Sequence, residues 1–263
     1  PLSATPDRSS NIATELRYAD NPGGRPVPVV LVHHKDLDRG ETHVAKLIAY
    51  GGYAVRTQAN FFHHALDVYG LAEQRNVVLA YADVWDGAAD EVNAAARMLI
   101  EEGYTTASQL TRAGRSRGGA TVGLAGTHAP DLSAKLLLEH GMVDTIGHEF
   151  TPNGPGNVPE FGSVATPEGL ERKLQIDVYR NLPVVDFPEQ IMVTTGHLDN
   201  RVEASASGKL VAALQHANDE AGRRADVLLR SDPQVGHFQM TVEQMATYAT
   251  DIGLFVVLEA IDR

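Results

Sequence analysis

The segment "QLTRAGRSRGG", residues 109–119, decides the fold expected of this chain. Its first six residues favour a strand, and the small-residue run "GGATVGLAGTHA" at 118–129 favours a helix. Between them, residues 114–118 match G-x-S-x-G, the pattern of a sharp strand-to-helix turn that exposes a serine. The free N–H groups at the start of that helix would face an oxyanion forming at Ser116. We therefore predict that Ser116 is a nucleophile rather than an ordinary serine in a glycine-rich loop.

Strands and helices alternate on both sides of this segment. Continuous apolar cores at 134–140, 189–196 and 225–231 are typical of strands buried on both faces. Such alternation favours an α/β fold with a mostly parallel sheet and helices on both faces. Further strands are predicted at 12–20, 27–34, 44–50, 76–83 and 109–114, and helices at 88–103, 118–129, 207–222 and 241–260.

The chain is expected to form one domain after a short arm. Residues 1–11 are polar, and residues 12–263 carry the alternating pattern without a linker or an internal repeat. A chain of 263 residues that is 43% hydrophobic can bury a large core. Residues 151–167 are rich in proline, glycine and asparagine, so we expect a loop or insertion there, of the kind that often forms a lid or a binding wall.

Composition excludes several classes of partner and site. The formal net charge of −12 argues against binding to nucleic acid or to an anionic membrane. The chain has no cysteine, which excludes disulfides and thiolate chemistry, and no apolar run is long enough to span a membrane. We expect a soluble protein, either cytoplasmic or exported with its signal already removed, and the sequence does not choose between them. It is also compatible with a homo-oligomer.

A serine nucleophile needs a base and an orienting carboxylate, and the chain offers both downstream. Asp199 follows the predicted strand 189–196, and His237 follows the predicted strand 225–231. Functional residues of open α/β sheets gather at these carboxyl ends of strands. Taken alone, Asp199 is also compatible with an Asx turn and His237 with a loop or helix-capping histidine. Taken together, in the order Ser, Asp, His, they favour a catalytic triad.

Four stretches in order resemble the catalytic domain of the prolyl oligopeptidase family. They are "AYGGY" at 49–53, "IEEGYTTASQLTRAGRSRGG" at 100–119, "GHLDNRV" at 196–202 and "GHF" at 236–238. The family pattern is Y-G-G-F, then E-G-Y-T-x-x-x-x-L-x-x-x-G-x-S-x-G-G, then H-D-D-R-V, then G-H-G. The resemblance covers nearly the whole chain from about residue 12 and implies an α/β-hydrolase fold.

The resemblance also implies roles for individual residues. Ser116, Asp199 and His237 match the family triad, and Tyr50 matches the tyrosine whose hydroxyl helps to form the oxyanion hole. The backbone N–H of Arg117 would be the second oxyanion donor. Arg201 matches the arginine that binds substrate in proline-specific members, and a salt bridge near the triad is the other interpretation of this residue.

Several positions depart from the family pattern. Members usually carry a seven-bladed propeller before this domain, and we expect none here. Phe150 stands near the place of the proline-stacking tryptophan, whereas the single tryptophan, Trp85, lies elsewhere; both are kept as substrate-binding candidates. Arg117 replaces the asparagine that usually follows the nucleophile. Hydrolase chemistry is expected to tolerate these changes, while a preference for proline does not follow.

The sequence therefore predicts a serine hydrolase that cleaves short peptides through an acyl-enzyme. An esterase with the same triad is the first alternative, and a non-catalytic binding module on this scaffold is the second. The chemistry needs no cofactor. We expect no metal site, because the side chains of adjacent histidines, at 33–34 and 63–64, point apart on a strand and diverge on a helix.

Overall fold

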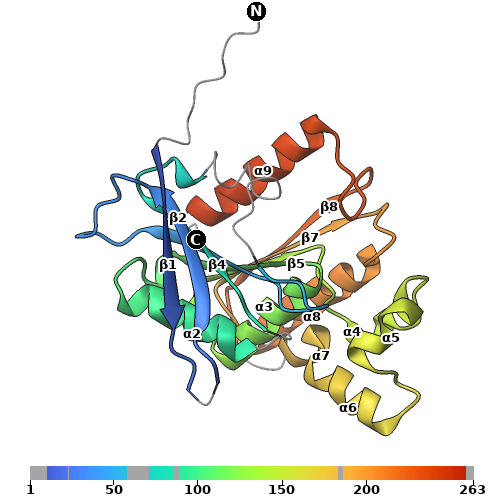
Figure 1. Ribbon diagram of the computed structural model, residues 1–263. Helices are drawn as coiled ribbons and strands as arrows, with labels where there is room; N and C mark the ends of the chain where they lie inside the picture. The colour runs from blue at the N-terminus through green and yellow to red at the C-terminus, as the bar shows by residue number, and fades with distance from the viewer. Residues whose placement is uncertain (1–10, 23, 58–70, 86–88, 183–185, 259–263) are drawn as a thin grey trace, which may run out of the picture.

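One eight-stranded sheet organises the chain (Figure 1). The computed structural model describes residues 11–22, 24–57, 71–85, 89–182 and 186–258. The strand order is β1-β2-β4-β3-β5-β6-β7-β8. β2 pairs antiparallel with β1 and β4, and all other neighbours are parallel, as predicted. The strands are β1 Ile12–Ala19, β2 Val27–His34, β3 Val44–Ala49, β4 Val77–Ala82, β5 Leu110–Arg115, β6 Lys135–Glu139, β7 Gln190–Gly196 and β8 Asp226–Asp232.

Helices cover both faces of this sheet. The main core packs α2 (Ala89–Glu101), α3 (Arg117–His128) and α8 (Ala204–Ala221) against one face. On the other face, α9 (Val242–Val257) packs through Tyr248, Ile252 and Phe255. Figure 1 shows α9 on the side of the sheet opposite α2 and α3. The shorter helices are α4 Thr145–His148, α5 Val158–Phe161, α6 Pro167–Gln175 and α7 Val178–Asn181, with single 3₁₀ turns at η3 Ala107–Gln109, η4 Pro130–Leu132 and η5 Gly154–Asn157.

A buried arginine fixes the strand that leads to Ser116. Arg112, in β5, is 0% exposed, and burial lowers its pKa to about 10. Its guanidinium donates to Asn93 Oδ1 (2.7 Å) in α2 and to Ser133 Oγ (2.8 Å). It also donates to the carbonyls of Ala125 and Ala129 at the end of α3 (both 2.9 Å). A buried cation is stable only when its donors are matched, so these contacts lock β5 to both flanking helices.

One sequence expectation needs revision, and another gains detail. Residues 225–231 were predicted to form a strand buried on both faces, but β8 is the last strand of the sheet. Leu228 and Leu229 of this edge strand are 42% and 43% exposed, so neither side chain is fully buried. Residues 151–167, predicted as a loop or insertion, contain η5 and α5 and end where α6 begins. Phe161 of this segment is buried against Met142 and Val202.

Other expectations fall outside what the structure describes. The predicted N-terminal arm, 1–11, lies there except for its last residue, as does the histidine pair at 63–64. In the described part of the chain, no helix combines the length and the apolarity needed to cross a bilayer.

Candidate active site

Ser116 occupies a strained turn between β5 and α3. Its φ is 56° and its ψ −121°, a backbone conformation that costs a non-glycine residue about 1–3 kcal/mol. Close packing explains the flanking glycines: a Cβ at Gly114 would lie 2.1 Å from the carbonyl oxygen of Gly118. A Cβ at Gly118 would lie 2.5 Å from the carbonyl oxygen of Ala49. The G-x-S-x-G spacing is therefore a steric requirement of this turn.

Neighbouring backbone holds the turn in place. The N–H of Ser116 donates to the carbonyl of Glu139 at the end of β6 (2.8 Å). The carbonyl of Ser116 accepts from the N–H of Met142 (2.9 Å), just beyond the same strand. The serine side chain is thereby left half-buried at the carboxyl edge of the sheet, directly before the first turn of α3.

Asp199 and His237 form a tight buried pair at the same edge. His237 Nδ1 lies 2.6 Å from Asp199 Oδ2, and neither side chain is more than 1% exposed. Asp199 Oδ1 accepts the N–H groups of Arg201 and Val202, both at 2.9 Å. The carboxylate of Asp199 thus closes an Asx-type turn and also contacts a histidine. The Asx-turn interpretation of Asp199 and its pairing with His237 are therefore compatible.

The carboxyl group of Asp199 is held ionised. Burial alone would raise its pKa, but hydrogen bonds from His140 and His237 and from the two backbone N–H groups outweigh burial. The pKa of Asp199 therefore lies well below its usual range. An ionised carboxylate accepts but does not donate, so the Nδ1 atom of His237 carries the proton that faces Asp199.

The other ring nitrogen of His237, Nε2, takes no part in the pair with Asp199. His237 Nε2 is buried and has no hydrogen-bond partner among the described residues. The loop that carries it is fixed from the side by Arg115, whose guanidinium donates to the carbonyl of His237. The same guanidinium lies 5.2 Å from the ring of Phe238 and 5.9 Å from the ring of Tyr248. Arg115, which directly precedes Ser116, thus contacts the loop that carries His237.

Tyr50 lies next to Ser116. It follows the end of β3, and its carbonyl accepts from Thr121 Oγ1 in α3 (2.9 Å). Burial raises the pKa of the Tyr50 hydroxyl, while the positive charge of Arg117 and a hydrogen bond with the Ser116 side chain work in the opposite direction. The net effect is a higher pKa, so the hydroxyl keeps its proton at neutral pH and remains a donor.

The remaining predicted site residues are distributed around this centre. Arg117 is buried, with its guanidinium 5.1 Å from the ring of Phe161. Arg201 is exposed, with its guanidinium 5.5 Å from the ring of Phe238 beside His237. Trp85 lines a cavity of about 240 Å³ together with Gly52, Arg56, Asp83 and Glu160, among other residues.

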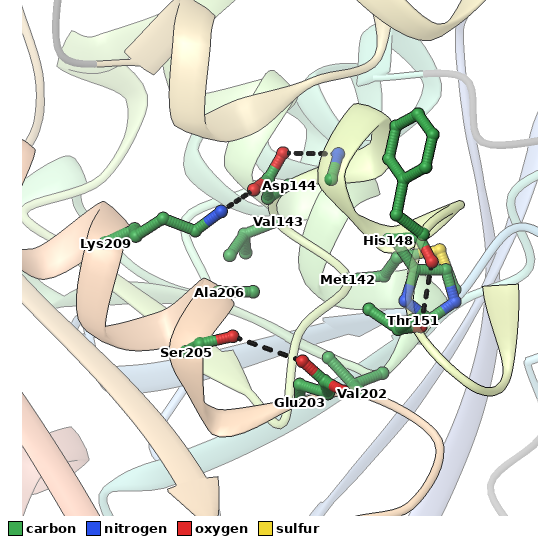
Figure 2. A pocket seen from close by; sticks show the side chains of 12 residues that line it. Met142, Val143, Asp144, His148, Thr151, Val202, Glu203, Ser205, Ala206 and Lys209 are labelled. Carbon is green, nitrogen blue, oxygen red and sulfur yellow. Dashed lines mark hydrogen bonds and ion pairs between the residues drawn. The ribbon is translucent and has the colours of Figure 1, made fainter. Parts of the chain in front are cut away.

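Another cavity of about 240 Å³ lies between α4 and α8 (Figure 2). Met142 and Val202 line it, and their backbone N–H groups bond Ser116 and Asp199 respectively. Phe150 also lines it and is 76% exposed. Figure 2 shows Lys209 reaching across to Asp144, and these two side chains form an ion pair. The others that line the cavity are Val143, Gly147, His148, Thr151, Glu203, Ser205 and Ala206.

Sequence reasoning missed two residues of this centre. Neither Arg115 nor His140 was singled out as a site residue. His140 follows β6 immediately, at the same edge of the sheet as Ser116, and this position was the available signal.

His140, Asp199 and His237 place one ligand-type atom each within 4.8 Å of one another. A metal ion there would have to replace hydrogen bonds that both Nδ1 atoms make to Asp199 Oδ2. The 2.6 Å separation of His237 Nδ1 and Asp199 Oδ2 is that of a charge-assisted hydrogen bond. These three residues are thus already joined by hydrogen bonds to one carboxylate oxygen.

Comparison with known proteins assigns the family. Residues 80–257, more than half of the chain, match the sequence profile of the prolyl oligopeptidase family. The chain belongs to this family. The prolyl endopeptidase of Dictyostelium discoideum is 24% identical over 88% of this chain and 32% of its own length. Dipeptidyl aminopeptidase BI of Pseudoxanthomonas mexicana is 26% identical over 87% of this chain and 34% of its own. This family member thus spans about a third of the length of these relatives.

Solved structures of the family confirm the predicted fold. A structure from a study of two prolyl endopeptidases has a TM-score of 0.82 and 26% identity, over 95% of this chain and 39% of that one. A post-proline cleaving enzyme from Rickettsia typhi has a TM-score of 0.82 and 22% identity, over 94% of this chain and 37% of that one. The matched parts are catalytic domains of α/β-hydrolase fold, as predicted from the residues around Ser116.

Proposed function

We propose that this chain is a serine peptidase domain that cleaves peptide bonds in short peptides through Ser116, His237 and Asp199. One observation carries the proposal: a serine on a strained turn shares its sheet edge with a buried Asp–His pair whose outer ring nitrogen is free. Membership of a family of serine peptidases supports the same chemistry. The relatives' printed activities, prolyl endopeptidase and dipeptidyl aminopeptidase, are both cleavages of peptide bonds.

The reaction would proceed in two halves. Ser116 Oγ attacks the carbonyl carbon of the scissile bond while His237 Nε2 takes the hydroxyl proton, and Asp199 holds the Nδ1–H of the resulting imidazolium. Collapse of the tetrahedral intermediate breaks the C–N bond, and Nε2 returns the proton to the leaving amine. Water then attacks the acyl-enzyme with His237 again as the base, which releases the acid and regenerates Ser116.

Two donors would stabilise the oxyanion of the intermediate. The Tyr50 hydroxyl is one, since its raised pKa keeps it protonated beside Ser116. The backbone N–H of Arg117 is the other, because it begins α3, where the first N–H groups have no partner within the helix. The positive end of the α3 dipole favours negative charge at the same point.

The cavity between α4 and α8 would receive the residue on the acyl side of the scissile bond. Met142 and Val202 connect it to the triad through their backbone hydrogen bonds and offer an apolar wall. Phe150 stands exposed at this cavity and is available to stack on the substrate. The exposed guanidinium of Arg201, 5.5 Å from the ring of Phe238, would also bind substrate. Trp85 lines the other cavity, so we assign it no part in binding this residue.

Labelling with a fluorophosphonate probe tests the nucleophile. The wild-type chain should be labelled and Ser116→Ala should not; equal labelling of the two would refute the triad, and absence of labelling in both would favour a binding module. Anilides and matching esters of the same acyl residue then separate the activities. Cleavage of the ester alone would assign an esterase instead of a peptidase.

Filling the cavity tests its role in substrate binding. Ala206→Phe, inside the cavity, should lower kcat/KM at least about tenfold for anilides with a large acyl residue and leave glycine anilides nearly unchanged. Ala212→Phe, on the exposed face of the same helix, is the matched control and should behave as wild type. Equal losses for large and small acyl residues would contradict the assignment.

A further inference from the structure

His140 is a second histidine on the carboxylate that orients His237, and the mechanism above does not use it. Its side chain is 1% exposed, and its Nδ1 lies 3.2 Å from Asp199 Oδ2. The same oxygen is 2.6 Å from Nδ1 of His237, and the two rings lie edge to face with centroids 5.9 Å apart. One carboxylate oxygen therefore faces two imidazole rings from different loops.

The backbone fixes His140 in this position. It follows β6 with a φ of 46°, a left-handed conformation that turns the chain at the carboxyl edge of the sheet. Its N–H donates to the carbonyl of Thr194 in β7 (3.0 Å). Glu139 pairs with Thr194 in the parallel ladder, so this register brings His140 alongside the loop that carries Asp199.

The charges around His140 favour a neutral ring. Burial lowers its pKa, the hydrogen bond to Asp199 raises it, and the positive charge of Arg115 lowers it. From α9, Tyr248 approaches with its ring centroid 6.1 Å away, and its hydroxyl donates to Glu139 Oε2 (2.7 Å). Since the ionised Asp199 can only accept, the Nδ1 atom of His140 carries the ring proton and donates it to Oδ2.

We propose that His140 is a positioning residue that shares the Oδ2 atom of Asp199 with His237. His237 is then less basic than it would be if it were the only histidine bound to that carboxylate. This inference rests on the proposed function. A second donor takes up part of the negative charge that otherwise stabilises protonated His237. In a plot of kcat/KM against pH, the acidic limb then lies at lower pH, because His237 stays unprotonated over a wider pH range.

Removing the donor should move that limb in a defined direction. In His140→Leu and His140→Gly, the whole charge of Asp199 acts on His237, so protonated His237 becomes more stable. The apparent pKa of the acidic limb of kcat/KM should rise by about one unit, a tenfold change in the dissociation constant. His140→Asn should return the limb to within about 0.3 unit of wild type, since its amide nitrogen takes the place of Nδ1 and asparagine tolerates a positive φ.

The design separates this role from simple packing. Leucine fills the volume of the ring and glycine removes any strain at the positive φ, so a shift common to both reports the lost donor. If the leucine variant fails to fold, the glycine and asparagine variants decide the question. A uniform fall in rate with an unmoved limb, or an asparagine variant that behaves like leucine, would overturn the proposal.

A second measurement does not depend on catalysis. NMR titration of the His237 ring in a Ser116→Ala background should show the same upward shift when His140 is replaced and the same rescue by asparagine. If the wild-type chain fails to react with a fluorophosphonate, the proposed function fails, while this titration still decides whether His140 tunes His237. An unchanged His237 titration in His140→Gly would refute the inference by itself.

Discussion

Replacing Asp199 with asparagine should abolish the base while leaving the shape of the site intact. Two backbone N–H groups, from Arg201 and Val202, bind Oδ1 and require an oxygen at that position. The amide nitrogen of an asparagine would therefore face the two histidines, where Asp199 presents Oδ2. Two N–H donors cannot share a hydrogen bond, so His237 must move its proton from Nδ1 to Nε2. In that tautomer Nε2 is a donor and cannot accept the proton of Ser116.

The expected loss is large because the wrong tautomer is the stable one. We expect kcat to fall about 10⁴-fold, an increase of about 5 kcal/mol in the activation free energy, as for the same exchange in the serine protease triad. The assay is hydrolysis of a peptide anilide together with the rate of fluorophosphonate labelling. Asn200→Ala, at the exposed neighbouring position, is the control and should keep wild-type rates. A variant with more than about a tenth of wild-type kcat would refute the tautomer argument.

Three further substitutions test the surrounding structure. Tyr50→Phe should lower kcat about 10²-fold with an unchanged melting temperature, and an unchanged kcat would remove Tyr50 from the oxyanion hole. Gly114→Ala should lower the free energy of unfolding by about 3 kcal/mol because of its steric clash, whereas Gly156→Ala, with nothing within 4 Å, should not; denaturant titration compares them. A hydrogen bond from Lys173 lowers the pKa of Glu149 to about 2, so this contact stabilises the fold above pH 4.5 and is lost as pH falls through 2. Glu149→Gln should therefore cost about 1 kcal/mol at pH 7 and converge with wild type near pH 2, and a pH-independent deficit would contradict the ion-pair origin.

The order of strands and helices was predictable because each element carries its own periodicity. The strands at the centre of the sheet carry continuous apolar runs: all residues of β4 are apolar, and β6 has three leucines in a row. The exposure of β8 was not predictable in the same way. "ADVLLRS" has the pattern of a central strand, and only the strand order shows that β8 has a neighbouring strand on one side alone. Local pattern determines the kind of element, whereas the element's neighbours determine which of its faces are covered.

The candidate triad was predictable for a related reason. Ser116, Asp199 and His237 each follow a strand, and parallel strands bring their carboxyl ends to one edge. His140 satisfies the same rule, but its role depends on which strands are adjacent and in what register. Only the pairing of Glu139 with Thr194 brings its ring to Asp199, and no local pattern encodes that pairing.

The two arginines beside the serine, Arg115 and Arg117, contact different parts of the site. The side chain of Arg115 lies against Phe238 and Tyr248 and holds the carbonyl of His237. The side chain of Arg117 packs toward Gly52 and Phe161 instead. Substitution of Arg115 should therefore act on the base, and substitution of Arg117 on the oxyanion side near Tyr50. The two arginines of GRSRGG thus connect the strained turn to the segments on either side of it.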